Sequence, residues 1–269
     1  MLKNIKNEKR KSKLPLISIV IPVLNSESTL NETLESVITQ DYPYIQVIVQ
    51  DGLSSDRSIN IARSFQERYP SIFNVYSQKD KGQYDAINKG FKKTKGDVLA
   101  FINADDRYAP GALITVGNYF RQYNPLWAAG KGRVVNKRGE EIAKIVTMYK
   151  SILLSINNYS LLIMVNYLMQ PSVFLSKKAY QEFGPFIGTK KFLKEYDLWL
   201  KLGGVQMPDI IPAVLSEFRI TGTTISATQF ETLLADDIAT AKRYTDNQTL
   251  ILLRRLHNLG RVIFLRFLT

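Results

Sequence analysis

The sequence predicts an α/β protein in which helices flank a mostly parallel central sheet. Three observations predict this class. Short β-branched runs alternate with segments of helical periodicity from Leu16 to about residue 110. The first run, Ile17–Val23, is almost entirely apolar, as strands covered on both faces tend to be. After Pro110 this rhythm changes, and the chain is expected to end in a C-terminal helical extension.

Four strands and three helices are expected in the first half. The strands are Ile17–Val23, Ile45–Val49, Phe73–Tyr76 and Val98–Ile102. A capping box, Thr29 with Glu32, is expected to open the first helix. The apolar face of that helix is Leu30, Leu34, Val37 and Ile38. Asp56 is expected to cap the second helix, and the third is expected over Asp85–Lys93. Strands joined by helices form right-handed crossovers, which predict one parallel sheet.

A β-hairpin, four helices and one strand are expected in the second half. The hairpin is expected from Gly132–Asn136 and Glu140–Val146, on either side of a turn at Lys137–Gly139. The expected helices are Asn158–Met169, one that Ser176 caps and Gly184 ends, Glu195–Leu202 stopped by Gly203 and Gly204, and Glu231–Tyr244. The expected strand is Ile210–Ile220.

The composition limits the chemistry that the chain can perform. None of the 269 residues is cysteine, which excludes disulfides, thiolate metal sites and a cysteine nucleophile. Only one residue, His257, is histidine, which excludes a multi-histidine metal cage. Catalysis is therefore expected to rely on carboxylates, hydroxyls, amides and hard cations.

The positive charge of the chain lies at its two ends. The net charge is +12, of which residues 1–13 and residues 242–269 contribute +5 each, leaving +2 for residues 14–241. A nucleic-acid-binding protein usually spreads its cations over a folded face, so no nucleic acid is expected as a partner. Two basic ends favour attraction to an anionic membrane surface, and tails that only increase solubility are the alternative.

The last helical segment has the composition of a helix lying in a membrane interface. Its apolar stripe is Leu252, Leu253, Leu256, Leu259, Ile263 and Phe267, and the cations beside it are Arg254, Arg255, Arg261 and Arg266. This stripe predicts a peripheral location at the inner face of the plasma membrane, the alternative being packing on the rest of the chain or on a second subunit. No segment has the roughly 20 uninterrupted apolar residues of a spanning helix, and residues 1–13 do not begin a signal peptide.

Acidic and amide residues follow the expected strands at their carboxyl ends, where open parallel sheets bind ligands. They are Asn25, Asp51, Asp80, Asn103, Asp105 and Asp106. No glycine-rich loop follows the first strand, which excludes Rossmann and Walker-type phosphate binding. A bound diphosphate would instead need Mg²⁺ or Mn²⁺ held by Asp105 and Asp106, with Lys81 adding a point charge. The alternative for Asp105 and Asp106 is a helix N-cap before Pro110.

Seven segments together resemble the family-2 inverting glycosyltransferases of GT-A fold. They are Pro15–Leu24, Val47–Asp56 (VIVQDGLSSD), Lys79–Gly90 (KDKGQYDAINKG), Ala100–Pro110 (AFINADDRYAP), Gln170–Phe174 (QPSVF), Glu195–Lys201 (EYDLWLK) and Ser216–Gly222 (SEFRITG). The resemblance implies a GT-A domain over residues 15–225, with a nucleotide-binding half at 15–110 and an acceptor-binding half at 111–225. A basic tail, residues 1–14, would precede this domain, and a basic amphipathic helical extension, residues 226–269, would follow it.

The resemblance implies a nucleotide-sugar site with a divalent metal. Asp51 would accept the N3–H of a uracil base, an N–H that cytosine lacks. Asp105 would bind Mn²⁺ or Mg²⁺, and Asp106 would share it. The remaining positions would line the base pocket (Pro22 and Asn25), the ribose and diphosphate (Asp80, Lys81, Asn103 and Arg219) and the sugar (Asp85 and Asn88).

The resemblance also implies a catalytic base at the start of a helix. Glu195 stands at that position, where most relatives have Asp, and Asp197 remains a competitor for the role. The base would remove the proton of the acceptor hydroxyl as that oxygen attacks the anomeric carbon. Two other positions depart from the commoner pattern: Asn103 replaces an Asp, and Thr221 stands where relatives often have His.

These observations predict an enzyme that moves a sugar from a UDP-sugar or similar donor to a hydroxyl of a polysaccharide or a lipid-linked acceptor. Because Asn103 and Glu195 depart from the family pattern, an inactive member that binds nucleotide or lipid without transfer is the alternative. A sugar-nucleotide nucleotidyltransferase would need a glycine-rich N-terminal loop, which Pro22–Ser26 does not provide.

Overall fold

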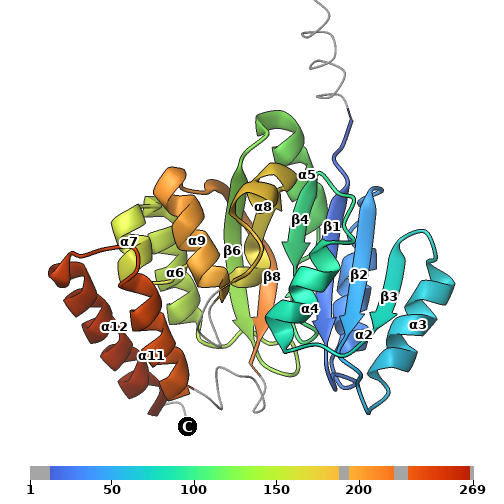
Figure 1. Cartoon of the computed structure of the whole chain (residues 1–269), viewed down its shortest axis with the longest axis horizontal. Helices are drawn as coiled ribbons and strands as arrows, with labels where there is room; N and C mark the ends of the chain where they lie inside the picture. The colour runs from blue at the N-terminus through green and yellow to red at the C-terminus, as the bar shows by residue number, and fades with distance from the viewer. Residues whose placement is uncertain (1–12, 188–193, 221–229, 267–269) are drawn as a thin grey trace, which may run out of the picture.

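The computed structural model of the chain describes residues 13–187, 194–220 and 230–266, and it contains one eight-stranded sheet (Figure 1). The strands lie in the order β3-β2-β1-β4-β7-β6-β8-β5. Their bounds are β1 Ile17–Val23, β2 Ile45–Asp51, β3 Phe73–Ser77, β4 Val98–Phe101, β5 Arg107–Tyr108, β6 Trp127–Val135, β7 Val173–Ser176 and β8 Asp209–Arg219. The four strands predicted in the first half and the strand predicted at 210–220 are all confirmed, within one or two residues at each end.

Most of the described strands run in one direction. β1 pairs in parallel with β2 and β4, and β2 pairs in parallel with β3. β7 is antiparallel to both β4 and β6, so β6 runs in the same direction as β4, and β8 is parallel to β6. Only β7 and the short β5 run against the other six described strands. The predicted mostly parallel sheet is therefore confirmed, and six carboxyl ends meet at one edge.

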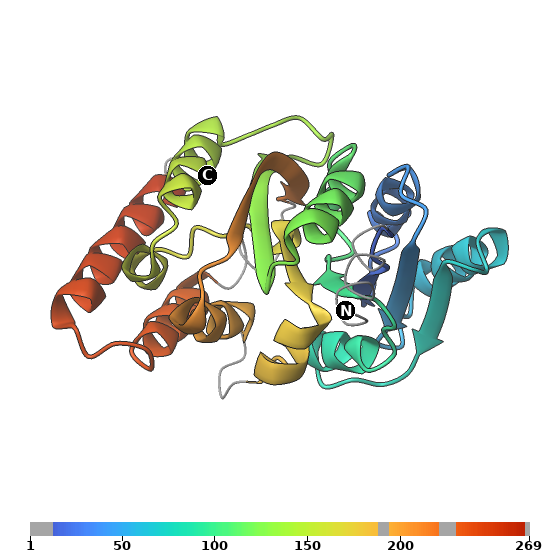
Figure 2. The ribbon, with the colours of Figure 1, turned by 90° about the horizontal axis from the view of Figure 1, so that it is seen from above.

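Helices cover both faces of the sheet, as the view from above shows (Figure 2). The first half contributes α2 Leu30–Ile38, α3 Ser58–Arg68 and α4 Gln83–Phe91, and α5 Ala112–Tyr123, which the sequence analysis did not predict, follows it. The second half contributes α6 Lys144–Ile156, α7 Tyr159–Met164, the 3-10 turn η1 Gln170–Ser172, α8 Lys177–Phe183, α9 Lys194–Val205, α11 Phe230–Ala241 and α12 Gln248–Arg266. No helix in the described ranges is long and apolar enough to cross a membrane.

Alternating side chains of β1 divide the interior into two cores. Ile19 and Ile21 point to one face, where they pack with α2, α3 and α5. Val20 points to the other face, where α4, α7, α8 and α9 lie. Every residue of β1 and β2 is buried, so both faces of these central strands are covered, which explains why exposed polar residues do not alternate along them.

The first helix begins without the predicted capping box. The Thr29 hydroxyl donates to the carbonyl of Ala104 at 2.8 Å, so it does not cap α2. Glu32 forms ion pairs with Arg107 and Arg219 in place of the box. The prediction was wrong because partners distant in sequence satisfy both side chains. At the second helix the Asp56 carboxylate accepts the N–H of Ser58 at 2.9 Å, as expected of a residue at a helix start.

The predicted hairpin at residues 132–146 is wrong in its second strand. The turn exists, because the N–H of Gly139 donates to the carbonyl of Asn136, but beyond it only an isolated bridge joins Val135 to Glu141. β8 pairs along one edge of β6, while β7 and η1 occupy the other edge. At the end of that second edge the N–H of Asn136 donates to Glu140 and the N–H of Ile142 donates to Val134, but the pairing stops there and the chain continues as α6, a helix that the sequence analysis did not predict.

Two helices end at other residues than predicted. Asn158 caps α7 as a helix start should, but the helix ends at Met164 and residues up to Met169 are extended. α9 runs through Gly203 and Gly204 to Val205. A β-carbon at either glycine would lie 3.2–3.4 Å from the ring of Tyr159, so these glycines permit close contact between α7 and α9 and do not stop the helix.

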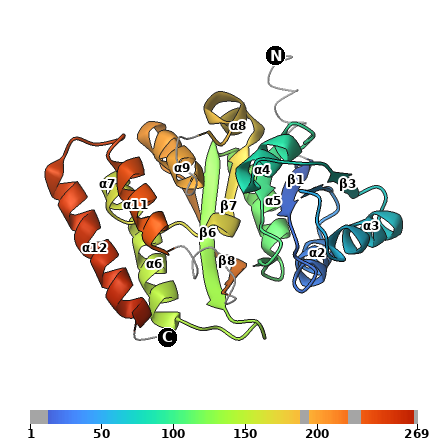
Figure 3. The same cartoon turned by 60° about the horizontal axis from the view of Figure 1, so that its bottom comes forward.

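The C-terminal extension is part of the folded body. Arg254 of α12 is 1% exposed and forms an ion pair with the buried Asp237 of α11. Its guanidinium also donates to the hydroxyl of Tyr196 in α9 and to the carbonyl of Ile163 in α7. The prediction that Arg254 lies on a membrane-facing side is therefore wrong. Figure 3 shows α11 and α12 standing beside α6 and α7 at the end of the molecule away from β3.

Candidate active site

The residues predicted for a site follow the carboxyl ends of β1, β2 and β4, at the shared edge of the sheet. β1 leads to Asn25, β2 ends at Asp51, and β4 leads to Asn103. The register pairs Val23 of β1 with Asp51 of β2, which sets the first two loops beside each other. The parallel topology thus brings together polar groups that are far apart in the sequence.

Asp51 is 1% exposed and its carboxylate is already hydrogen-bonded. The hydroxyls of Ser54 and Ser77 donate to it, as do the N–H groups of Leu53 and Ser54. The carboxylate therefore organises the loop between β2 and α3. A base N–H that binds Asp51 would have to replace one of the two serine hydroxyls, because hydrogen bonds from these hydroxyls are easier to exchange than those from the backbone N–H groups.

The loop after β1 is tied to the loop after β2. The Asn25 side-chain oxygen accepts the N–H of Ser55 at 2.8 Å, and the N–H of Asn25 donates to the Ser54 hydroxyl at 2.9 Å. Asn25 itself is exposed and has a φ of 51°, a left-handed conformation that asparagine tolerates. Pro22 is a buried residue of β1, so its ring contributes to the wall beneath this loop.

Four of the predicted residues lie just before α4 or in it: Asp80 and Lys81 precede the helix, and Asp85 and Asn88 belong to it. Asp80 lies against Gly52, where a β-carbon would be 2.5 Å from the Asp80 carboxylate. The Asp85 carboxylate accepts the N–H of Lys81 and pairs with Lys89, and hydrogen bonds from these groups lower the pKa of Asp85. The side-chain oxygen of Asn88 accepts the N–H of Phe186 at 2.9 Å, and the side-chain N–H of Asn88 donates to the carbonyl of Phe186 at 3.0 Å. Asn88 therefore has a structural role. Lys81 is exposed at the rim.

Asp105 and Asp106 form a buried acidic pair after β4. Burial raises the pKa of Asp105. Burial and the charge of Asp105 raise the pKa of Asp106 further. Asp106 is 0% exposed and accepts the N–H of Arg219 at 2.9 Å and the amide N–H of Asn103 at 3.3 Å. Asp105 is partly exposed, so of the two carboxylates it is the one open to a ligand.

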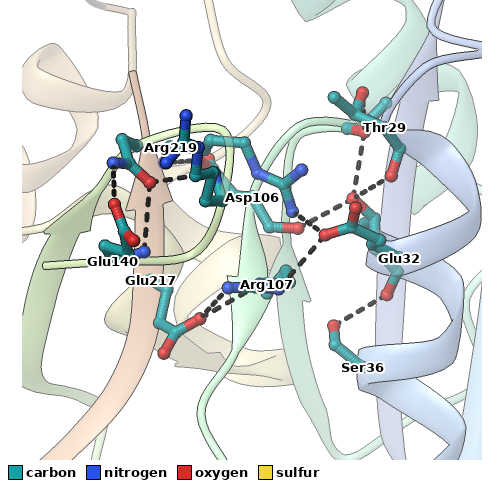
Figure 4. Close-up of polar contacts among 12 residues, drawn as sticks. Thr29, Glu32, Ser36, Asp106, Arg107, Glu140, Glu217 and Arg219 are labelled. Carbon is teal, nitrogen blue, oxygen red and sulfur yellow. Dashed lines mark hydrogen bonds and ion pairs between the residues drawn. The ribbon is translucent and has the colours of Figure 1, made fainter. Parts of the chain in front are cut away.

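Four charged side chains form a network next to Asp106 (Figure 4). Glu32 of α2 pairs with Arg107 at 3.1 Å and with Arg219 at 2.7 Å, and Arg107 also pairs with Glu217 at 2.8 Å. Arg219 is 2% exposed, and among the residues that the structure describes its Nε–H has no hydrogen-bond partner. Arg219 thus lies beside Asp106, and one side of its guanidinium is held by Glu32.

Glu195, in the first turn of α9, is hydrogen-bonded by the hydroxyl of Tyr84 in α4. Burial raises the pKa of Glu195 against the opposing effect of this hydrogen bond. Burial and the charge of Glu195 raise the pKa of Tyr84 well above its ordinary value, so the phenol stays protonated and donates. A carboxylate with a raised pKa and a fixed orientation is suited to accept a proton near neutral pH.

Asp197, the competing candidate, is engaged by three partners. It is 2% exposed and pairs with Lys201 at 3.0 Å and with Arg243 at 2.9 Å. The hydroxyl of Tyr244 also donates to its carboxylate. Asp197 therefore holds α9 to the segment after α11, and its oxygens are not free to accept a proton from a substrate.

Adjacent side chains at the start of α4 connect the acidic pair to Glu195. The amide N–H of Gln83 donates to the side-chain oxygen of Asn103 at 2.6 Å, while Tyr84 donates to Glu195. Gln83 and Tyr84 were missed as site residues, although they lie in the segment KDKGQYDAINKG that the resemblance rests on. Thr221, where relatives often have His, lies outside the described residues.

A divalent cation fits the acidic pair only with help from a ligand. Within the described ranges no cluster of three or more acidic or histidine side chains could hold a metal ion alone. Burial raises the pKa values of Asp105 and Asp106 although the charge of Arg219 lowers them, so Arg219 compensates the ionised carboxylates only in part. Mg²⁺ and similar ions are commonly held by one or two carboxylates together with phosphate oxygens of the substrate, and Asp105 with Asp106 offers that donor set.

Comparison with known proteins gives the chain a family and a fold. The sequence model of glycosyl transferase family 2 matches residues 18–184. An uncharacterized glycosyltransferase of Haemophilus influenzae is 32% identical over 139 residues, which cover 52% of this chain and 55% of that protein. The chain thus spans about half the length of this curated relative.

Two solved structures share the architecture of the chain. A mannosyltransferase from Pyrobaculum calidifontis in complex with GDP-Man and Mn²⁺ has a TM-score of 0.70 at 15% identity, covering 96% of this chain and 77% of that one. The TarS protein of S. aureus in complex with UDP-GlcNAc has a TM-score of 0.61 at 15% identity, covering 84% and 66%. At these identities the likeness shows the fold, and the predicted GT-A fold is confirmed.

Proposed function

We propose a function for this chain on one premise: it belongs to glycosyl transferase family 2. The proposed activity is transfer of a sugar, with inversion at the anomeric carbon, from a nucleoside-diphosphate sugar to an acceptor hydroxyl. The donor is a UDP-sugar, and the acceptor belongs to the synthesis of a cell-surface polysaccharide or glycolipid. Support for a nucleotide-sugar donor comes from the two structural neighbours, whose complexes contain UDP-GlcNAc and GDP-Man.

One observation carries this proposal: the first turn of α4 contacts both halves of the site. Gln83 binds Asn103 beside the acidic pair, and Tyr84 binds Glu195 on α9. A donor diphosphate held at Asp105 and a base at Glu195 would therefore lie on two sides of one short helix start. Inverting transfer needs this arrangement, because the acceptor oxygen attacks the anomeric carbon from the side opposite to the leaving diphosphate.

In the proposed reaction Glu195 is the base. Its carboxylate takes the proton of the acceptor hydroxyl while that oxygen forms a bond to the anomeric carbon. The bond from the anomeric carbon to the diphosphate oxygen breaks at the same time, and its electron pair leaves with the nucleoside diphosphate. Tyr84 holds the carboxylate in position throughout. Asp105 and Asp106 would hold Mn²⁺ or Mg²⁺, which when bound would supply positive charge to stabilise the departing diphosphate.

The nucleotide part of the donor would lie over the loops after β1, β2 and β3. Asp51 is proposed to accept the base N–H, with Pro22 and Asn25 at the wall of the pocket. The remaining donor contacts are assigned to Asp80, Lys81, Asp85, Asn88, Asn103 and Arg219. The unpartnered Nε–H of Arg219 supports a phosphate contact, because a phosphate oxygen would satisfy it.

A location at the membrane follows from the proposed acceptor. We place the protein peripherally at the inner face of the plasma membrane, where lipid-linked acceptors would be presented. The two basic ends of the chain support this placement, because each cation near an anionic surface contributes about 1 kcal/mol.

The test is a donor screen followed by a transfer assay. Thermal shift with UDP-, GDP- and dTDP-sugars, with and without Mn²⁺, should identify a stabilising donor, and hydrolysis of that donor should require Glu195. The alternative function, nucleotide or lipid binding without transfer, is favoured by the departures at positions 103 and 195. It predicts stabilisation by a nucleotide with no donor hydrolysis, and the same rate for wild type and Glu195→Gln.

A further inference from the structure

An exposed apolar surface lies on α6 and α12. Nine of the 17 large hydrophobic side chains that are exposed in the described ranges belong to these two helices. They are Ile145, Met148, Tyr149, Ile152 and Ile156 on α6, and Leu252, Leu253, Leu256 and Leu259 on α12. We call these nine residues the outer face. Single exposed hydrophobic residues are ordinary, but a concentration of this kind marks an interaction site.

The outer face is formed by two neighbouring stripes. On α6 the residues recur at helical spacing, so they share one side of that helix, and Ile145 is 71% exposed. On α12, Leu252, Leu256 and Leu259 likewise share one side. The ring of Tyr149 on α6 stacks on His257 of α12 at 6.1 Å between centroids, so the two helices contact each other. Figure 3 shows them side by side at one end of the molecule.

The opposite side of α12 is fixed to the protein. Ile251, Arg254 and Asn258 are buried, and both Arg254 and Asn258 bind the carboxylate of Asp237. α12 therefore cannot turn its leucines inward without breaking a buried ion pair, which is costly. The exposed stripe is a property of the folded state.

The outer face has no negative charge of its own. No Asp or Glu occurs from Ile142 to Gln181 or from Asn247 to Thr269. Exposed cations accompany the stripes, with Lys144 at the start of α6 and Arg255 on α12. An apolar surface with cations and without carboxylates matches the chemistry of an anionic lipid interface, where side-chain hydrocarbon enters the acyl boundary and cations meet the headgroups.

We propose that α6 and α12 together form the surface by which the protein binds an anionic phospholipid bilayer. A second copy of the chain is a poorer occupant, because two such faces would bring like charges together with no carboxylate to pair them. α6 follows β6 by a short loop, so it begins at the sheet edge that carries the candidate site. This inference adds a binding surface to the proposed membrane location. It rests on the proposed function only where it concerns the lipid-linked acceptor, because binding to vesicles needs no catalysis.

The test is co-sedimentation of the full chain with vesicles of equal parts phosphatidylglycerol and phosphatidylcholine. Ile152→Gln and Leu256→Gln remove side chains that are 54% and 56% exposed, and each should lower partitioning about fivefold, the double variant more. The matched control Tyr123→Gln removes a side chain of α5 that is 55% exposed and should leave partitioning unchanged. Arg255→Gln should weaken binding about fivefold at low salt, whereas Arg63→Gln, an exposed arginine of α3, should not.

Two results would overturn the proposal. The first is equal pelleting of wild type and the Ile152→Gln, Leu256→Gln double variant. The second is a wild-type dimer in solution that the double variant loses, because that result assigns the outer face to a second copy. Circular dichroism and nucleotide thermal shift, measured without vesicles, report folding and the donor site separately. A protein that binds vesicles through the outer face but no nucleotide would reject the proposed enzyme function and leave this inference standing.

Discussion

The contact between Tyr84 and Glu195 makes a quantitative prediction about pH. Tyr84→Phe removes the one donor that the described structure gives to this carboxylate and keeps the ring, which packs at 6.2 Å from Phe186 between centroids. A hydrogen bond to a charged group contributes about 1.5–3 kcal/mol, which corresponds to about tenfold to a hundredfold in an equilibrium constant. The ionised form of Glu195 loses this contribution and the protonated form does not, so the pKa of Glu195 should rise.

The direction of the kinetic effect follows from the role of the carboxylate. Only the ionised form accepts a proton, so a higher pKa leaves less active base at neutral pH. We expect the acid limb of the pH profile of kcat to move to higher pH in Tyr84→Phe, with a rate at neutral pH lower by about tenfold or more. At alkaline pH the rate should recover toward that of the wild type, and KM for the donor should change little.

The assay is release of nucleoside diphosphate from the donor, measured across pH for wild type, Tyr84→Phe and Tyr180→Phe. Tyr180 is a matched control, because its hydroxyl lies 3.4 Å from Asn88 on the same helix and does not contact Glu195. An acid limb that stays in place, or moves to lower pH, in Tyr84→Phe would refute the assignment of Glu195 as the base. A loss of rate that is equal at every pH would also refute it, since that pattern indicates a structural defect.

Three further predictions concern the acidic residues. Glu195→Gln should bind donor normally in thermal shift and lose about 10²–10⁴ in transfer rate. Asp197→Asn should mainly lower the free energy of unfolding, by about 1–3 kcal/mol. The opposite pattern would exchange the roles of the two residues. Asp105→Ala should abolish metal-dependent UDP binding, and Asp51→Ala should weaken UDP binding while metal affinity changes little; equal UDP affinity in wild type and both variants would contradict the site. The folded state raises the pKa of Asp105 and Asp106 above the ordinary carboxyl value of about 4. Without metal, the free energy of unfolding of the wild type should therefore fall as pH rises from about 4 through these raised pKa values. Asp105→Asn should therefore raise Tm in chelator at neutral pH and remove the stabilisation by Mn²⁺, and an unchanged Tm in both conditions would count against the acidic pair.

The first half of the fold was predictable from sequence because its elements are specified locally. β1 and β2 are buried runs of β-branched residues, and their ends are marked by polar turns, so period and composition agree there. The second half depends on pairing that local patterns do not contain. Residues 140–146 contain the β-branched residues of a strand, yet beyond one bridge to Val135 they form no strand, and α6 begins at Lys144.

The candidate site shows the same division. The loop acids could be located because parallel strands deliver them to one edge, which is a rule of topology. The ion-pair network beside Asp106 could not be located, because Glu32, Arg107, Glu217 and Arg219 come from three elements, α2, β5 and β8, and meet only in the folded protein. The sequence also could not decide which of Glu195 and Asp197 is the catalytic base, because both lie in one turn of the same helix. Lys201, Arg243 and Tyr244, two of which lie after α11, engage the Asp197 carboxylate and so support our proposal of Glu195 as the base.

The amide of Asn103 avoids adding a further negative charge beside Asp105 and Asp106. Asn103 accepts from Gln83 through its oxygen and donates to Asp106 through its N–H, so its two ends serve opposite partners. An aspartate could accept from Gln83 but could not donate to Asp106, and it would add a third negative charge beside two carboxyls whose pKa values are already raised. The asparagine therefore keeps the link between α4 and the acidic pair without that repulsion. Since the same helix start orients Glu195 through Tyr84, the two departures from the family pattern, at positions 103 and 195, lie at the two ends of one chain of contacts.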